Sequence, residues 1–429
     1  MPALLWADDQ GRIRDFPDLE MTGFSGGDPV RPEPEGLVAL PDYSRLFFLP
    51  GCPPVGYDSR KGQYVRLSQV KAGRRRFTAH AVAAFLAPGW VRTLAPAADY
   101  SAKKIILPMW SYTAVGFGEA DYLVPAFRIE ENPAWDPAGF DDDELLPLLE
   151  KRLAQRGSNR LYEHLVGCAV DNHCFAAKNL FLGRGEAPLP VSRACNASCL
   201  GCLSLQPAEG AAVSHFRLGF RPTAEEVAQV ALDHLEAVPE GIVSFGQGCE
   251  GEPLTETPLL IEAIKKIRAK TLNGTINLNT NGSDPEAVAR LAEAGLDSIR
   301  VSLASPRPEI FQAYVKPQGF GLKEVTQSLT KAHQKGLFTM VNYLVFPGVS
   351  DQEAEVEAMI GFLRGCQVRF LHLKNLCIDP DYYLRSIPFP DSPAIGLESL
   401  AETLRSEVKG LKLGYFNQPA AGRPGPGSD

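Results

Sequence analysis

The sequence has no long hydrophobic run, no excess of positive charge and no repeated unit. No apolar stretch approaches the roughly 18 residues of a membrane span. The first residues, Met1 to Trp6 followed by Asp8 and Asp9, lack the basic and apolar regions of a secretory signal. The 43 Lys and Arg against 51 Asp and Glu give a net charge of −8, so no overall field attracts nucleic acid. We therefore expect a cytoplasmic protein without a membrane partner, and nucleic acid is not an expected partner.

Cysteine is sparse and unevenly spread. Nine cysteines in 429 residues, an odd number without a secretory signal, argue against a disulfide framework. With 45% hydrophobic and 22% charged residues, the composition is that of a globular protein with a large core, which excludes disordered and fibrous classes. The length allows two or three domains.

The chain divides into an irregular first part and a regular second part. Up to about residue 185, Pro- and Gly-rich stretches separate short β-like runs, such as residues 44–49 and 122–129, and two helices are predicted near residues 145–153 and 159–170. From Leu189 onward, short apolar runs alternate with amphipathic segments, which is the pattern of βα units around a parallel sheet.

The second part is predicted to contain six strands with helices between them. The strands are expected at residues 189–193, 242–245, 275–279, 298–303, 338–344 and 368–373, and the helices at 223–237, 257–270, 285–294, 322–335 and 351–364. A further αβ unit at 397–408 and 411–415 precedes a Pro- and Gly-rich tail, residues 420–429, that is expected to be disordered.

We predict an α/β protein: a partial (β/α)6 TIM-like barrel with an N-terminal α+β domain. The expected domains are residues 1–185, with a possible role as lid or substrate domain, residues 186–385, the barrel, and residues 386–429, a C-terminal αβ extension with the tail.

Three cysteines stand close together in the loop that leaves the first predicted barrel strand. Cys195, Cys199 and Cys202 have x3 and x2 spacing. A zinc site would usually need a fourth ligand nearby, and neither a second CxxC nor a His pair follows within forty residues. Three thiolates suit a [4Fe–4S] cluster in which one iron has no protein ligand. A zinc knuckle or three unrelated thiols is the alternative interpretation.

The CxxxCxxC segment after the first strand of a βα series resembles the signature of the radical S-adenosylmethionine (SAM) superfamily. Later signatures follow in order at the ends of predicted strands, where barrel enzymes build their sites. Gly251-Glu252-Pro253 resembles the family's GGEP motif, and Asn279 opens a segment that resembles its TNG turn. The resemblance covers about residues 189–380. One departure is Gly201, because many members carry an aromatic residue just before the third cysteine.

The resemblance implies cofactors and contacts. The three cysteines would bind the [4Fe–4S] cluster, and Glu252 would hold the ammonium of SAM, since a carboxylate pairs with a cation. Further SAM contacts are expected at the ends of later strands, from Asn279, Ser302 and Asn342; polar residues there are also common turn formers. For Glu252, the alternative interpretation is a helix-start carboxylate ahead of Pro253.

The activity implied by the resemblance is reductive cleavage of SAM at the cluster to a 5′-deoxyadenosyl radical, which abstracts hydrogen from a substrate. A reductant such as flavodoxin or ferredoxin is an expected partner. The substrate is not identified, and a peptide or protein side chain and a small metabolite are the leading options. Alternatives are an RNA-modifying radical SAM enzyme, for which the basic segment Lys71 to His80 is the candidate contact, and a non-catalytic iron–sulfur electron-transfer or sensor protein.

The remaining cysteines show no standard metal spacing. Cys168 and Cys174, with His164 and His173 around them, and Cys52 in a separate loop leave open an auxiliary metal site. Cys249, four residues before Pro253, could touch a cofactor, but a lone cysteine is more often a small buried filler. We interpret Cys366 and Cys377 as packing residues.

Overall fold

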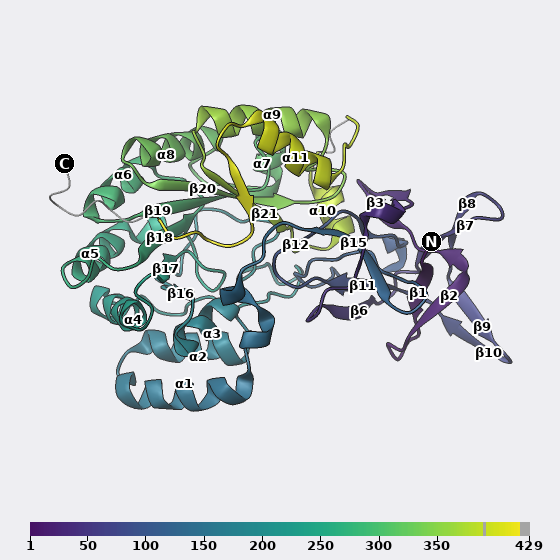
Figure 1. Ribbon diagram of the computed structural model, residues 1–429, viewed down its shortest axis with the longest axis horizontal. Coiled ribbons are helices and arrows are strands. Elements are labelled where there is room, and N and C mark those ends of the chain that lie inside the picture. The colour runs from purple at the N-terminus through teal and green to yellow at the C-terminus, as the bar shows by residue number, and fades with distance from the viewer. Residues whose placement is uncertain (389–391, 421–429) are drawn as a thin grey trace.

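The computed structural model describes residues 1–388 and 392–420, so most of the predicted disordered tail lies outside the described residues. The chain forms a lobe of antiparallel strands, a group of helices and a curled parallel sheet covered by helices (Figure 1). The α/β class, with a partial parallel barrel and a separate N-terminal sheet, is confirmed.

The N-terminal lobe is mostly antiparallel β structure. Its main sheet runs β12-β15-β14-β1-β2-β7-β8, with β11 joining β1 to β6 and β5 beside β15; β13-β3-β4 and β9-β10 form smaller sheets. The strands are β1 Ala3–Ala7, β2 Ile13–Glu20, β3 Gly23–Ser25, β4 Asp28–Val30, β5 Leu37–Ala39, β6 Arg45–Leu49, β7 Val55–Asp58, β8 Gln63–Arg66, β9 Gln69–Ala72, β10 Arg75–Thr78, β11 His80–Phe85, β12 Trp90–Arg92, β13 Ala95–Pro96, β14 Gly116–Phe117 and β15 Tyr122–Arg128.

Three helices follow this lobe and pack against the barrel. They are α1 Asp142–Arg156, α2 Arg160–Val170 and α3 Phe175–Leu182. The Tyr162 hydroxyl on α2 donates to Asp233 of α4 (Ala224–Ala237) at 2.6 Å, and apolar residues of α1 to α3 belong to the same core cluster as the barrel. The first two helices match the prediction, whereas the short α3 was not predicted. The boundary at residue 186 stays a prediction.

The second part forms one parallel sheet in sequence order, β16-β17-β18-β19-β20-β21-β22. The strands are β16 Glu186–Pro188, β17 Ile242–Phe245, β18 Thr275–Thr280, β19 Ser298–Leu303, β20 Phe338–Val345, β21 Phe370–Asn375 and β22 Lys412–Gly414. The helices after α4 are α5 Thr257–Arg268, α6 Pro285–Ala294, α7 Pro308–Val315, α8 Leu322–Gln334, α9 Glu353–Gly365, α10 Pro380–Ser386 and α11 Leu397–Glu407, and short 3-10 turns include η5 Pro253–Glu256.

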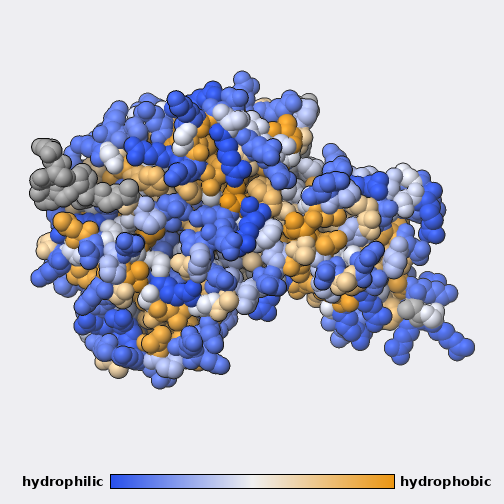
Figure 2. All heavy atoms as spheres, in the orientation of Figure 1, coloured by the Kyte–Doolittle hydropathy of each residue, from blue (hydrophilic) through white to orange (hydrophobic). Residues whose placement is uncertain are grey.

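Apolar side chains on one face of these strands pack under the helices and form the main core. On β20, the hydroxyl of Tyr343 reaches Glu355 of α9 at 2.9 Å, so the residues that alternate with Tyr343 lie on the opposite, inner face of the curled sheet. In the view of Figure 2, apolar residues are also visible where the barrel meets the N-terminal lobe, flanked by hydrophilic ones.

The first barrel strand differs from the prediction, because it ends at Pro188 instead of spanning residues 189–193. Pro190 has no N–H to donate to a neighbouring strand. The next two amides, of Val191 and Ser192, donate instead to the Glu250 carboxylate at 2.8 and 2.9 Å. A side-chain acceptor from another loop has therefore replaced the sheet partner.

Candidate active site

The three motif cysteines lie in the loop between β16 and α4. Cys195, Cys199 and Cys202 are half-buried free thiols. Burial raises the pKa of Cys199, and the neighbouring Cys195 and Cys202 raise it further because one thiolate repels another. The thiols are therefore close enough to interact electrostatically, and a cation that binds all three would remove that repulsion.

The end of α7 holds the cysteine loop by backbone hydrogen bonds. The amides of Ser198 and Leu200 donate to the carbonyls of Val315 and Tyr314 at 3.1 and 2.9 Å. The same helix explains Gly201, because a Cβ at that position would lie 2.4 Å from the Tyr314 hydroxyl oxygen. A buried aromatic side chain from α7 thus occupies the space beside the third cysteine, and a larger residue at position 201 would collide with it.

The loop after β17 carries the Gly251-Glu252-Pro253 segment and is bound directly to the cysteine loop. The amide of Gly251 donates to the Ser192 carbonyl and that of Glu252 to the Ala194 carbonyl, both at 2.8 Å. A Cβ on Gly251 would lie 1.9 Å from the Ala194 carbonyl oxygen, so only glycine allows this approach. The structure thereby brings the predicted cluster ligands and Glu252 to the same end of the sheet.

The Glu252 carboxylate is buried, with 4% of the residue exposed. It accepts hydrogen bonds from the Thr280 hydroxyl at 2.5 Å, from the Asn281 amide at 2.8 Å and from the Leu254 amide at 3.0 Å. Burial nevertheless raises the pKa of Glu252 to about 7. Among the described residues, no positively charged side chain lowers this pKa. The site is therefore one in which a bound ammonium group would stabilise the charged carboxylate.

Pro253 opens the 3-10 turn η5, and Glu252 is the residue that caps this turn through the Leu254 amide. The alternative interpretation of Glu252 as a helix-start carboxylate is thus also realised. The cap uses only part of the acceptor capacity of the carboxylate, which can accept about four hydrogen bonds. Capping and ligand binding are compatible roles here.

The other predicted SAM contacts lie on the inner face of the sheet. Ser302 and Asn342 are register partners on β19 and β20, and Asn279 is on β18. Within residues 1–388 and 392–420, the Nδ2 of Asn279 and the Oδ1 of Asn342 are buried without a hydrogen-bond partner. A buried polar atom without a partner is costly, so these two atoms favour a bound polar molecule on this face.

Glu250 is a central residue of the site that the sequence analysis missed. Its carboxylate accepts four backbone hydrogen bonds, from the amides of Gly246 and Gln247 at 2.6 and 3.2 Å as well as those of Val191 and Ser192. Burial raises its pKa to about 7. Its position beside the GEP segment was the available signal, but only the fold shows that it joins two loops.

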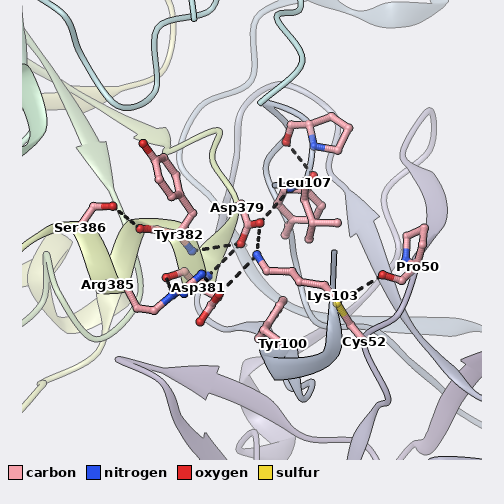
Figure 3. Close-up of polar contacts among 12 residues, drawn as sticks. Pro50, Cys52, Tyr100, Lys103, Leu107, Asp379, Asp381, Tyr382, Arg385 and Ser386 are labelled. Atoms are coloured by element: carbon pink, nitrogen blue, oxygen red, sulfur yellow. Dashed lines mark hydrogen bonds and ion pairs between the residues drawn. The ribbon is translucent and has the colours of Figure 1, made fainter. Parts of the chain in front are cut away.

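A second group of thiols includes Cys249 of the same loop. Cys249 contacts Cys168 of α2, whose Sγ is 3.6 Å from the Nε2 of His164. A hydrogen bond from Cys249 and the neighbouring His164 lower the pKa of Cys168. Cys52 lies beside Tyr100 in the N-terminal lobe (Figure 3), in a different core cluster from Cys168.

The N-terminal lobe contacts the barrel at the strand ends that carry the site. Arg92 of β12 is fully buried and donates to the Leu376 carbonyl, just beyond β21, at 2.9 Å. Close by, the Lys103 side chain forms ion pairs with the buried Asp379 and the half-buried Asp381 (Figure 3). The basic Arg74–Arg76 segment, by contrast, is in the exposed β9–β10 hairpin at the far end of the lobe (Figure 1).

The fold and the site define a half-barrel protein with a three-thiol loop at the carboxyl ends of its strands. Comparison with known families agrees: residues 189–360 match the model described as Radical SAM superfamily. The cofactors of this family, a [4Fe–4S] cluster and SAM, are those predicted from the resemblance. The thiol triad, the buried Glu252 and the unpartnered Asn279 and Asn342 atoms fit both groups.

Curated relatives carry the name GTP 3′,8-cyclase. The protein from Crocosphaera subtropica is 25% identical over 218 residues, which are 50% of this chain and 62% of the relative. The one from Streptomyces coelicolor is 34% identical over 106 residues, 24% of this chain and 30% of the relative. The chain thus spans less than two thirds of the length of these relatives.

Among solved structures, a radical SAM methyltransferase from Sphaerobacter thermophilus aligns with a TM-score of 0.39 and 16% identity, covering 54% of this chain and 67% of that one. Streptococcus suis SuiB bound to S-adenosylmethionine aligns with a TM-score of 0.39 and 13% identity, covering 73% and 72%. In the described residues, no helix is both long and apolar enough to cross a membrane.

Proposed function

We propose that this protein is a radical SAM enzyme whose cluster ligands are Cys195, Cys199 and Cys202. The observation that carries the proposal is the pair of backbone hydrogen bonds, Gly251 to Ser192 and Glu252 to Ala194, that join the thiol loop to a buried carboxylate. When bound there, the cluster and SAM supply the 5′-deoxyadenosyl radical that abstracts hydrogen from a substrate.

The residues of this chain bind and orient the cofactors in this proposal. The three thiolates would hold three irons of the cluster, and Arg217, which donates to the Cys202 Sγ at 3.4 Å, would place a positive charge beside it. The buried Glu252 carboxylate would accept a hydrogen bond from the ammonium group of SAM. The Asn279 amide and the Asn342 oxygen offer a donor and an acceptor to the rest of the molecule, and Ser302 lies beside Asn342.

The N-terminal residues up to about 185 are proposed to shield the site. The support is the buried contact surface around Arg92 and Lys103, which meets the barrel just after β21, at the end of the sheet where the thiol loop also lies. Limited proteolysis tests this role: we expect SAM to protect the lobe-to-barrel segment, and cleavage that SAM leaves unchanged would contradict a lid.

The substrate is proposed to be a small metabolite with an anionic group. Arg300 lies on the inner face of β19, and its Nε is buried without a partner in the described part of the chain. Glu186, which interacts electrostatically with Arg300, accepts hydrogen bonds from Gln247 at 3.0 Å and from Asn417 at 2.7 Å. A guanidinium so placed suits a phosphate or carboxylate. A peptide side chain remains the second candidate.

GTP, which the names of the relatives contain, is the first substrate probe. We expect an anionic substrate to stimulate 5′-deoxyadenosine formation in the wild-type enzyme and not in Arg300→Met, while SAM affinity stays unchanged in both. Stimulation that survives Arg300→Met would remove Arg300 from substrate recognition.

The proposed activity is tested by SAM cleavage. Anaerobically reconstituted protein, given dithionite or a reduced flavodoxin or ferredoxin, is expected to convert SAM to methionine and 5′-deoxyadenosine. A cluster that takes up electrons without consuming SAM would favour the electron-transfer or sensor alternative. RNA modification would require binding that weakens steeply with salt and is lost when Arg74 to Arg76 are replaced.

A further inference from the structure

A group of one half-buried imidazole and two buried thiols lies between α2 and the loop after β17. His164 and Cys168 are four residues apart on α2 and so share one helix face, and Cys249 faces them from the loop. The ligand atoms of all three residues lie within 4.8 Å of one another. Cys168 and Cys249 are each 2% exposed.

We propose that His164, Cys168 and Cys249 bind a zinc ion. Thiolate and imidazole are the donors that zinc prefers, and three protein ligands with one further position form a known tetrahedral arrangement. Zinc bond lengths of about 2.3 Å to sulfur and about 2.0 Å to nitrogen require a sulfur-to-nitrogen distance of about 3.5 Å in a tetrahedron. The Cys168 Sγ and the His164 Nε2 lie 3.6 Å apart.

Two further side chains of zinc-binding types, Cys174 and His215, lie near the group but outside the set of ligand atoms that are within 4.8 Å of one another. Cys174 follows α2, and its amide donates to the Cys168 carbonyl at 3.0 Å. The His215 ring lies beside Gly248, with its Nδ1 3.6 Å from the place of a Cβ there, and interacts electrostatically with Cys168. The surroundings therefore contain additional side chains of zinc-binding types, where ordinary thiol packing would need only apolar neighbours.

Zinc at this position would tie two distant segments of the chain together. Cys249 directly precedes Glu250, which holds the thiol loop, and stands three residues before Glu252. A zinc ion bound by Cys249 and by two residues of α2 would therefore fix this loop to the helix. Zinc binding itself does not depend on the proposed SAM chemistry, so either can fail without the other.

The test is elemental analysis of the full chain with its cluster reconstituted, purified under reducing conditions. We expect about one zinc per chain in addition to iron, as a single tetrahedral site requires. In Cys168→Ser and Cys249→Ser this zinc should fall to background. The matched control is Cys366→Ser, another buried cysteine that lies at the end of α9, and it should keep its zinc.

Cobalt substitution of the wild-type protein provides a readout that does not depend on the folding of the variants. We expect Co²⁺ to give the thiolate charge-transfer absorption of a tetrahedral site, and added Zn²⁺ to abolish it. The proposal is overturned if the wild-type chain binds neither metal beyond its cluster, or if the zinc remains in both variants. Extra iron and sulfide that depend on Cys168, or a Cys168–Cys249 disulfide found by mass spectrometry, would overturn it too.

Discussion

Two groups of thiols are connected to one loop, residues 246–253, and they differ in how the chain builds them. Cys195, Cys199 and Cys202 come from a single loop, are half-buried and are held mainly by backbone hydrogen bonds. Cys168 and Cys249 come from a helix and a distant loop and are almost fully buried. The first group can leave one metal position open to a ligand. The second group is covered by α2.

A single loop, residues 246–253, contacts both groups through different residues. Glu250 accepts backbone hydrogen bonds from the loop that leads to the three cysteines, while its neighbour Cys249 points to α2. Glu252, on the same loop, presents a buried carboxylate next to the open group. We therefore expect reactivity at the group of three cysteines and structural support at Cys168 and Cys249.

The largest expected effect separates the two groups directly. Cys199→Ala removes one of three cluster ligands, so we expect loss of the cluster iron and at least a hundredfold loss of SAM cleavage. Cys366→Ala is the matched control and should retain both. Colorimetric iron and sulfide analysis measures the first quantity, and equal iron in the two variants would contradict the assignment.

The next effect concerns the carboxylate. Glu252→Gln keeps the shape and the cap of η5 but removes the charge, so SAM affinity should fall about tenfold to a hundredfold, in line with about 1.5–3 kcal/mol for a hydrogen bond to a charged group. Iron content should not change. Glu256→Gln, which alters only an exposed ion pair with Arg221, is the control for equilibrium dialysis with labelled SAM. Equal affinities in both variants would show that Glu252 is only a cap.

A smaller effect tests the packing beside the third cysteine. Gly201→Ala should destabilise the loop by about 1–3 kcal/mol, because overpacking of a tight site costs that much. Tyr314→Phe removes the colliding oxygen and leaves the nearest ring carbon 3.3 Å from the new Cβ. We therefore expect the double variant to recover most of the stability and iron content that the single variant loses, as thermal unfolding and iron analysis would show. No recovery would mean that Tyr314 is not the obstacle.

The smallest effect is a pH dependence of SAM binding. The pKa of Glu252 is raised to about 7, so the carboxylate is charged above that pH and gains a proton below it. SAM affinity should be highest between about pH 7 and about pH 8, the usual pKa of an α-ammonium group, and fall by at most tenfold for each unit below pH 7. Glu250 titrates in the same range, so the comparison is with Glu252→Gln, whose affinity should show less of this decline. Identical profiles would assign the pH dependence to another group.

The strands and helices of the regular half of the chain could be predicted because the sequence patterns that indicate them are local. The strands β17 and β19 and the helix α6 have the predicted bounds, since apolar runs and N-terminal capping residues lie within the segments themselves. The three cysteines, Glu252 and the family were likewise visible within single segments. In the N-terminal lobe the predicted β-like runs at residues 44–49 and 122–129 match β6 and β15, but the sheet order was not predicted, because pairs such as β1 with β11 join segments far apart in the sequence.

The missed parts of the site all depend on contacts between distant segments. The first barrel strand ends early, and the amides that follow it, of Val191 and Ser192, donate to the Glu250 carboxylate of another loop. Tyr314 explains Gly201 only after α7 has been placed beside the cysteine loop. Cys249 was interpreted as a filler because Cys168 lies 81 positions earlier, and only the fold brings the two sulfur atoms together.

The most direct test of the central claim is electron paramagnetic resonance of the dithionite-reduced, reconstituted protein with and without SAM. A cluster with one open iron next to Glu252 should give the signal of a reduced [4Fe–4S] centre, and SAM should shift it in the wild-type protein. A cluster signal that SAM leaves unchanged, or a protein that holds zinc at Cys195, Cys199 and Cys202 and gives no signal, would contradict the account.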